Sequence, residues 1–198
     1  MWLARHGEVH NPAEILYGRL PRMRLSLEGQ RQADAVADFL QSQPLAAVYS
    51  SPMLRARRTA AACLARHPNL HRVRIDRDLQ EIRTGWQGEH TTALASINWD
   101  FYANPRHPED ETLQGIHARM CRWLGRMLRR HAGQEVLGVS HGDPILVLVG
   151  SLQGLPLDSQ RIFPKPYIET ATVFRLDFDA AGRCQQIDKH VPHAAVAA

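Results

Sequence analysis

Two His-Gly pairs, each at the end of an apolar segment, are the residues of this chain best suited to chemistry. His6 follows the segment WLAR with Arg5 beside it, and His141 follows VLGVS. A glycine after each histidine permits a tight turn or the close approach of a ligand. Guanidinium groups bind phosphate through paired hydrogen bonds. The two pairs therefore predict a shared site that can bind an anion.

Arg55 is a third candidate, near the start of a helix that follows the apolar segment LAAVYS. A helix start offers free N–H groups and the positive end of its dipole to an anion. Ligands of open α/β sheets bind at the carboxyl ends of the strands, where these residues lie. Taken singly, each has an ordinary interpretation: a His-Gly pair can be a turn, and Arg55 can be a solvated helix residue. Together they predict a phosphate cradle.

The elements that must position these residues follow from hydrophobic periodicity. Ser26 is placed to cap the first helix, and Pro52 is expected inside the first turn of the second. The region from Leu79 to Thr112 lacks periodicity and is expected to be irregular, and the tail VPHAAVAA to be loose. The expected strands are 2–5, 45–50, 73–75, 135–141, 170–178 and 184–190, and the expected helices are 25–43, 50–67, 113–131 and 142–154. Strands that alternate with helices predict an α/β fold with a largely parallel sheet.

Composition limits the function classes. The 198 residues are 44% hydrophobic and 22% charged, which fits one globular domain over residues 1–198. No segment is long enough for a membrane span, and no signal peptide is evident, so we expect a cytoplasmic protein without a membrane partner. The basic residues are scattered and no nucleic-acid-binding motif is present, so no nucleic-acid partner is expected. The three cysteines form no CxxC pair, which argues against a zinc site or a disulfide framework.

Four motifs resemble those of the histidine phosphatase superfamily, also called phosphoglycerate mutase-like. They are RHGE at 5–8, SSPMLRARRTA at 50–60, LQEIRTGWQG at 79–88 and SHGD at 140–143, and they occur in the family's order. LSLEGQRQA at 25–33 also matches. The resemblance implies a three-layer sandwich, with helices on both faces of a central, mostly parallel sheet.

The resemblance also implies roles for the candidate residues. By similarity, His6 is the nucleophile that becomes phosphohistidine, and Glu81 is the general acid. Arg5, Arg55 and His141 would hold the phosphoryl oxygens. His6 must be neutral to attack, and the two guanidinium charges disfavour its protonation. His141 should be cationic when a phosphate dianion is bound. Because two arginines and a histidinium already supply positive charge, we expect neither a metal nor another cofactor.

Asn11 and Asp143 are two further candidates. Asn11 matches the asparagine that lies beside the phosphate in this family. Asp143 could orient a group of the site, but a helix cap at Pro144 is the preferred interpretation. A metal site built from His6, His141, Glu8 and Asp143 is an alternative that no ligand-spacing signature supports.

We therefore expect a metal-independent phosphomonoester hydrolase that acts on a small phosphorylated metabolite. The context EIRTGWQG and the short chain favour a phosphatase over a mutase, which stays the alternative. A catalytically silent module that binds phosphorylated metabolites is a third hypothesis. The sequence leaves open whether the chain forms a homodimer. The loop His10–Arg24 and the segment 99–111 are the candidates for contacts with the leaving group. If Arg19, Arg22 and Arg24 face the pocket, a substrate with a second acidic group would fit.

Overall fold

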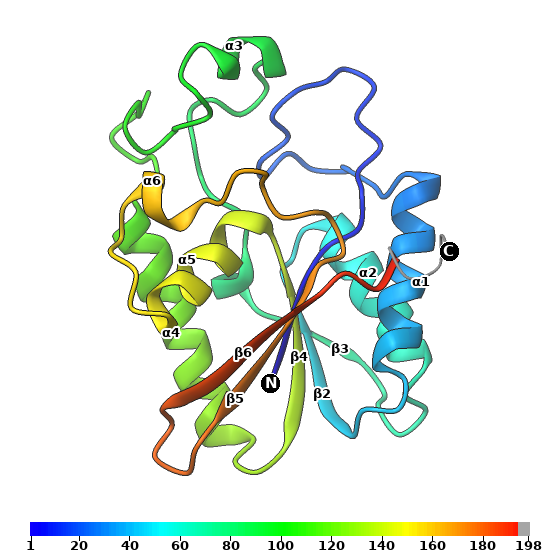
Figure 1. Ribbon diagram of the computed structural model, residues 1–198. Helices are drawn as coiled ribbons and strands as arrows, with labels where there is room; N and C mark the ends of the chain where they lie inside the picture. The colour runs from blue at the N-terminus through cyan, green and yellow to red at the C-terminus, as the bar shows by residue number, and fades with distance from the viewer. Residues whose placement is uncertain (194–198) are drawn as a thin grey trace.

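A six-stranded mixed sheet forms the centre of the computed structural model, which describes residues 1–193 (Figure 1). The strand order is β3-β2-β4-β1-β5-β6. The parallel part consists of β1 (Trp2–Arg5), β2 (Leu45–Ser50), β3 (Val73–Ile75) and β4 (Glu135–Ser140), and the antiparallel edge of β5 (Val173–Phe178) and β6 (Cys184–His190). The expected α/β fold is confirmed.

Helices cover both faces of the sheet, as Figure 1 shows. One face packs against α1 (Leu27–Leu40) and α2 (Leu54–Ala65), and the other against α4 (Leu113–Arg130) and α5 (Gly142–Leu152). Each face has its own apolar core, with Val36 and Ala60 in one and Met120 and Leu148 in the other. The three-layer sandwich is therefore confirmed.

Every predicted strand and helix is present: β1, β2, β3 and β6 have the predicted bounds, and the others are narrower. Ser26 caps α1 by accepting a hydrogen bond from the Gly29 N–H. The placement of Pro52 is wrong, because α2 begins only at Leu54, after an extended Met53. The backbone N–H of Ser51 donates to the Val139 carbonyl at 2.9 Å, which ties this segment to β4 and delays the helix.

The structure adds short elements that the sequence did not predict, namely η1 (Arg77–Leu79), α3 (Thr91–Ala95) and α6 (Ser159–Ile162). Between α3 and α4 the chain is irregular, as expected. Among the described residues, no helix is long and apolar enough to cross a membrane. The tail at residues 191–198 was expected to be loose. Its residues 194–198 lie outside the described part of the chain.

Three irregular segments gather at the carboxyl ends of the parallel strands (Figure 1). They are residues 7–26, 80–112 and 155–172. The strands β1, β2 and β4 lie next to one another in the sheet, so the residues that follow them are brought to the same edge. This arrangement places the predicted site between the sheet and the three segments.

Candidate active site

His6 lies directly beyond β1, and only 1% of its surface is exposed. Its backbone N–H donates to the Ser140 carbonyl at 3.1 Å, which fixes it to the end of β4. The ring Nδ1 lies 2.7 Å from the Gly7 carbonyl, so Nδ1 carries the proton and Nε2 keeps a lone pair. A Cβ on Gly7 would lie 2.3 Å from the Gly29 carbonyl oxygen, which explains the glycine.

Arg55, from the first turn of α2, lies fully buried between the two histidines. Its Nε donates to His6 Nε2 at 3.1 Å, and its Nη2 lies 3.1 Å from His141 Nδ1. Nη2 also donates to the Gly18 carbonyl at 2.7 Å, and the guanidinium lies 4.7 Å from the centre of the Tyr17 ring. The imidazole rings are 5.0 Å apart, so the two His-Gly pairs do meet.

His141 follows β4 and forms the N-cap position of α5 without a capping bond from its side chain. Its Nε2 lies 2.7 Å from the hydroxyl of Ser51. The following Gly142 leaves room for Tyr167, whose hydroxyl would lie 2.1 Å from an added Cβ. The second His-Gly pair therefore allows a close contact with the segment 155–172.

Two guanidinium nitrogens of this site lack partners. Arg5 Nη1 donates to the Ile168 carbonyl, and the guanidinium lies 5.2 Å from the centre of the Tyr167 ring. Arg5 Nε and Arg55 Nη1 are buried, however, and have no hydrogen-bond partner among residues 1–193. A buried donor without an acceptor costs about 1–3 kcal/mol. Both donors are thus available to an anion placed beside His6.

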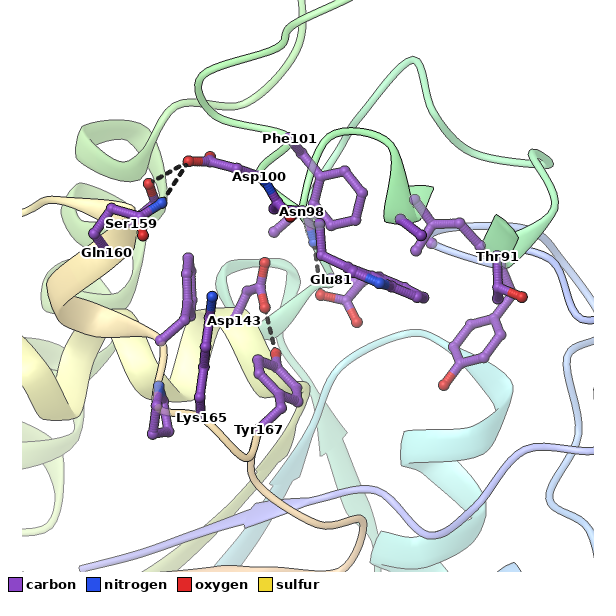
Figure 2. Close-up of a pocket in the computed structure, with 18 of the residues that line it drawn as sticks. Glu81, Thr91, Asn98, Asp100, Phe101, Asp143, Ser159, Gln160, Lys165 and Tyr167 are labelled. Atoms are coloured by element: carbon purple, nitrogen blue, oxygen red, sulfur yellow. Dashed lines mark hydrogen bonds between the residues drawn. The ribbon is translucent and has the colours of Figure 1, made fainter. Parts of the chain in front are cut away.

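Glu81 completes the cluster, with its side chain 15% exposed. Its Oε2 lies 3.4 Å from His141 Nδ1 and 3.7 Å from Arg55 Nη2, while Oε1 accepts from the Ile82 N–H at 3.0 Å. Figure 2 shows its carboxyl group facing a cavity of about 1090 Å³. A carboxyl group in this position could exchange a proton with a ligand in the cavity.

The comparisons with known proteins agree with this geometry. Residues 1–188 match the histidine phosphatase superfamily (branch 1). The chain belongs to this superfamily.

Its relatives include phosphatases and mutases. The chain is 41% identical over 152 residues to the uncharacterized protein Rv0525 of Mycobacterium tuberculosis, with 74% of each chain covered. It is 29% identical to phosphoserine phosphatase 1 of Hydrogenobacter thermophilus, over 78% of this chain and 76% of that one. Among solved structures, YhfR of Bacillus stearothermophilus has a TM-score of 0.80 at 26% identity, with 93% of each chain covered.

Burial dominates the electrostatics of the site in this member of the histidine phosphatase superfamily. Desolvation lowers the pKa of His6 well below 6.5, and the charges of Arg55 and Arg5 lower it further. Burial, followed by Arg55, also lowers the pKa of His141 well below 6.5. Desolvation raises the pKa of Glu81 above 4.5 against the opposing charge of Arg55. The site thus favours neutral imidazoles and a protonated carboxyl group.

Donor atoms of His6, Glu81 and His141 lie within 4.8 Å of one another, close enough to hold a metal ion. The guanidinium of Arg55 contacts all three groups, so a divalent cation there would have to displace a permanent positive charge. Glu8, part of the alternative metal set, instead accepts from the Ser26 hydroxyl at 2.5 Å. The donor set therefore fits an anion better than a metal.

Asn11 lines the cavity, but its amide is used within its own loop. Its Nδ2 donates to the Ile15 carbonyl at 2.9 Å, and its Oδ1 accepts from the Ile15 N–H at 3.3 Å. Asn11 therefore lies at the cavity, but its amide is hydrogen-bonded to Ile15 and not to His6.

The preferred interpretation of Asp143 as a helix cap is wrong. Its carboxylate accepts a hydrogen bond from the Tyr102 hydroxyl at 2.6 Å and another from the Tyr167 hydroxyl. Both tyrosines come from segments that cover the site, and Asp143 lines the cavity with Glu81 (Figure 2). Because its oxygens are engaged by these hydroxyls, they do not cap the backbone of α5.

The three loop arginines do not face the cavity. Arg19 donates to the Glu81 carbonyl at 2.7 Å and pairs with Glu111 at 3.0 Å, so it supports the backbone of the general-acid candidate. Arg22 and Arg24 are exposed and are absent from the cavity wall. The expected arginine contacts to an acidic substrate therefore have no basis here.

Sequence reasoning missed several supporting residues. Ser51 orients His141, and the hydroxyl of Thr59 accepts from the Gly7 N–H at 3.1 Å. Ser51 and Thr59 both lie in the motif SSPMLRARRTA, so the motif included them, but it did not indicate what either residue does. Tyr167 lies outside every motif, and nothing in its local sequence indicates its place beside Arg5.

Proposed function

We propose that this protein is a metal-independent phosphomonoester hydrolase that acts through a phosphohistidine at His6. The observation that carries the proposal is the pair of buried donors, Arg5 Nε and Arg55 Nη1, which have no partner in the described part of the chain. They belong to the two arginines beside His6, whose unprotonated Nε2 accepts from Arg55 Nε at 3.1 Å and would give up that hydrogen bond when it attacks. A phosphoryl group would satisfy both donors with its oxygens.

In the first step, His6 Nε2 attacks phosphorus and the bond between phosphorus and the ester oxygen breaks. The electron pair goes to the leaving oxygen, which takes the proton of Glu81. Arg5 and Arg55 would hold the remaining phosphoryl oxygens, together with His141 when the bound dianion favours its protonated form. In the second step Glu81 accepts a proton from water, water oxygen bonds to phosphorus, and the nitrogen–phosphorus bond breaks to release phosphate.

Hydrolysis is favoured over a mutase reaction by the size and access of the cavity. A mutase must keep water from its phosphohistidine until a second hydroxyl returns. Here a cavity of about 1090 Å³ is lined by Glu81 and Arg5, so it gives water room beside the carboxyl group that would activate it. The presence of nucleophile and acid in one cluster also supports an enzyme over a silent binding module. A cytoplasmic location stays a prediction from the sequence.

The test is a hydrolysis screen of phosphorylated metabolites with chelator-treated protein, followed by 3-phosphoglycerate to detect isomerisation. We expect release of phosphate without added metal. Intact-mass spectra of rapidly quenched samples should show one phosphoryl group on the wild type and none on His6→Ala. Metal-dependent turnover, or a covalent phosphate at another residue, would overturn the proposal.

A further inference from the structure

The cavity extends well beyond the groups that would bind phosphate. Its volume of about 1090 Å³ matches pockets that hold ligands of drug size, which are roughly 300–1,000 Å³. It reaches from Arg5 and Glu81 to Thr91 on α3 and Ser159 on α6. A three-carbon phosphate ester would leave most of this space unused, so the leaving group is expected to be larger.

Aromatic side chains form much of the distant wall. Trp99 and Phe101 come from the segment 99–111, with ring centres 6.4 Å apart, and Phe163 faces the same cavity from the segment 155–172. Trp99 is 49% exposed although it is a large apolar residue. Its φ of 61° is in the left-handed region, which costs a non-glycine residue about 1–3 kcal/mol. An exposed indole held in a strained conformation offers a surface for a planar ring.

Cationic side chains also line this cavity. Lys165 and Arg161 line it, and neither forms an ion pair within residues 1–193. The chain has 24 basic residues, of which only Lys165 and Lys189 are lysines. Figure 2 shows Lys165 extended into the space that Asp143 and Asp100 also face.

Asp100, a carboxylate that also lines the cavity, already has partners of its own. It accepts from the Ser159 hydroxyl at 2.7 Å, the Gln160 amide at 3.3 Å and the Ala103 N–H at 3.0 Å. Lys165 is therefore free to bind an anion that a ligand brings.

We propose, on the basis of the hydrolase function above, that the substrate is a phosphomonoester whose alcohol carries a planar ring and a second anionic group. The ring lies against Trp99, Phe101 and Phe163, and the anionic group pairs with Lys165. This assignment replaces the loop arginines with Lys165 as the residue that selects an acidic substrate.

The test compares 2-naphthyl phosphate with 6-carboxy-2-naphthyl phosphate, which differ only in the carboxylate. Within each variant we take the ratio of kcat/KM for the acidic ester to that for the neutral ester, so that a general loss of activity cancels. Lys165→Met should lower this ratio about three- to tenfold, as expected for a partly exposed charged pair. The matched control Lys189→Met, on the edge strand β6, should leave it unchanged. An unchanged ratio in Lys165→Met would overturn the assignment.

Trp99→Ala tests the aromatic wall. It should lower kcat/KM for both naphthyl esters about three- to tenfold relative to glycerol phosphate, which has no ring. Equal losses for all three esters would contradict the stacking role.

Binding to His6→Ala separates this inference from the proposed catalysis. Calorimetry with the two naphthyl esters needs no turnover, so it reports recognition even if wild type hydrolyses neither ester. Tighter binding of the acidic ester, lost on adding Lys165→Met, supports the inference independently. Equal binding of both esters would refute it even if the hydrolase function were established.

Discussion

Replacing Glu81 with Gln isolates the proton transfer at the leaving oxygen. Gln is nearly the same size and can keep the hydrogen bond from the Ile82 N–H to Oε1. Its amide can donate to His141 Nδ1, which lies 3.4 Å from Oε2 in the wild type. Burial raises the pKa of Glu81, so a neutral amide removes a desolvation cost and the variant should fold. Any loss of activity then reports on chemistry.

The magnitude depends on the leaving group. An alkoxide needs a proton as it departs, and loss of a general acid costs about 10²–10⁴-fold, or about 2.7–5.4 kcal/mol of transition-state stabilisation. A nitrophenolate leaves without a proton, so its kcat/KM should change by less than about threefold. We use kcat/KM because it reports the steps up to release of the alcohol and excludes hydrolysis of the phosphohistidine.

The pH dependence supplies an independent check of the same assignment. Alkyl ester cleavage requires neutral His6, whose pKa burial lowers well below 6.5, and protonated Glu81, whose pKa burial raises above 4.5. Activity should therefore fall on the acid side as His6 gains a proton and on the alkaline side as Glu81 loses one. Glu81→Gln should abolish only the alkaline limb. Equal losses for alkyl and aryl esters, or an unchanged alkaline limb, would refute the acid role.

Three other perturbations test the surrounding site. His6→Ala should reduce hydrolysis of every ester by about 10³-fold or more in steady-state assays, and activity near wild type would exclude the phosphohistidine. Asp143→Asn removes a charge that raises the pKa of Glu81, so the alkaline limb for alkyl esters should move to lower pH; a shift upward would contradict this coupling. Inorganic phosphate at about 100 times its Kd should stabilise the fold by about 2.7 kcal/mol in thermal unfolding, an effect that Arg5→Gln should weaken.

Local sequence patterns predicted most of the fold because they report local physics. The spacing of Ala33, Val36 and Leu40 follows one helix face, and all three are buried in α1. The short helix α6 was missed because four residues offer too little periodicity to detect. Pro52 was misplaced because the start of α2 depends on a backbone bond from Ser51 to distant Val139, which no local pattern reveals.

The site was predicted in its principal groups but not in its electrostatics. Sequence reasoning attributed the neutral state of His6 to the charges of Arg5 and Arg55, whereas burial is the larger cause. The burial of His6 depends on the segments that fold over the strand ends, and no sequence motif predicts how these segments pack. The same limit explains Asp143, whose partner Tyr102 lies 41 residues away in the irregular region.

The charge of the assembled site explains how it can work on a dianion without a metal. Arg5 and Arg55 contribute two permanent charges, the buried imidazoles are neutral, and Glu81 adds no charge while it carries its proton. In the free site the carboxylate of Asp143, held by the Tyr102 and Tyr167 hydroxyls, offsets part of the charge of about +2 that these groups supply, and the remainder is opposite in sign to a phosphate dianion. Burying Arg55 beside two neutral rings is costly for the fold, because 0% of the residue is exposed and one of its N–H groups lacks an acceptor. A tetrahedral anion would supply that acceptor, so under the proposed function the feature that weakens the free protein is the one that would bind and orient the phosphoryl group.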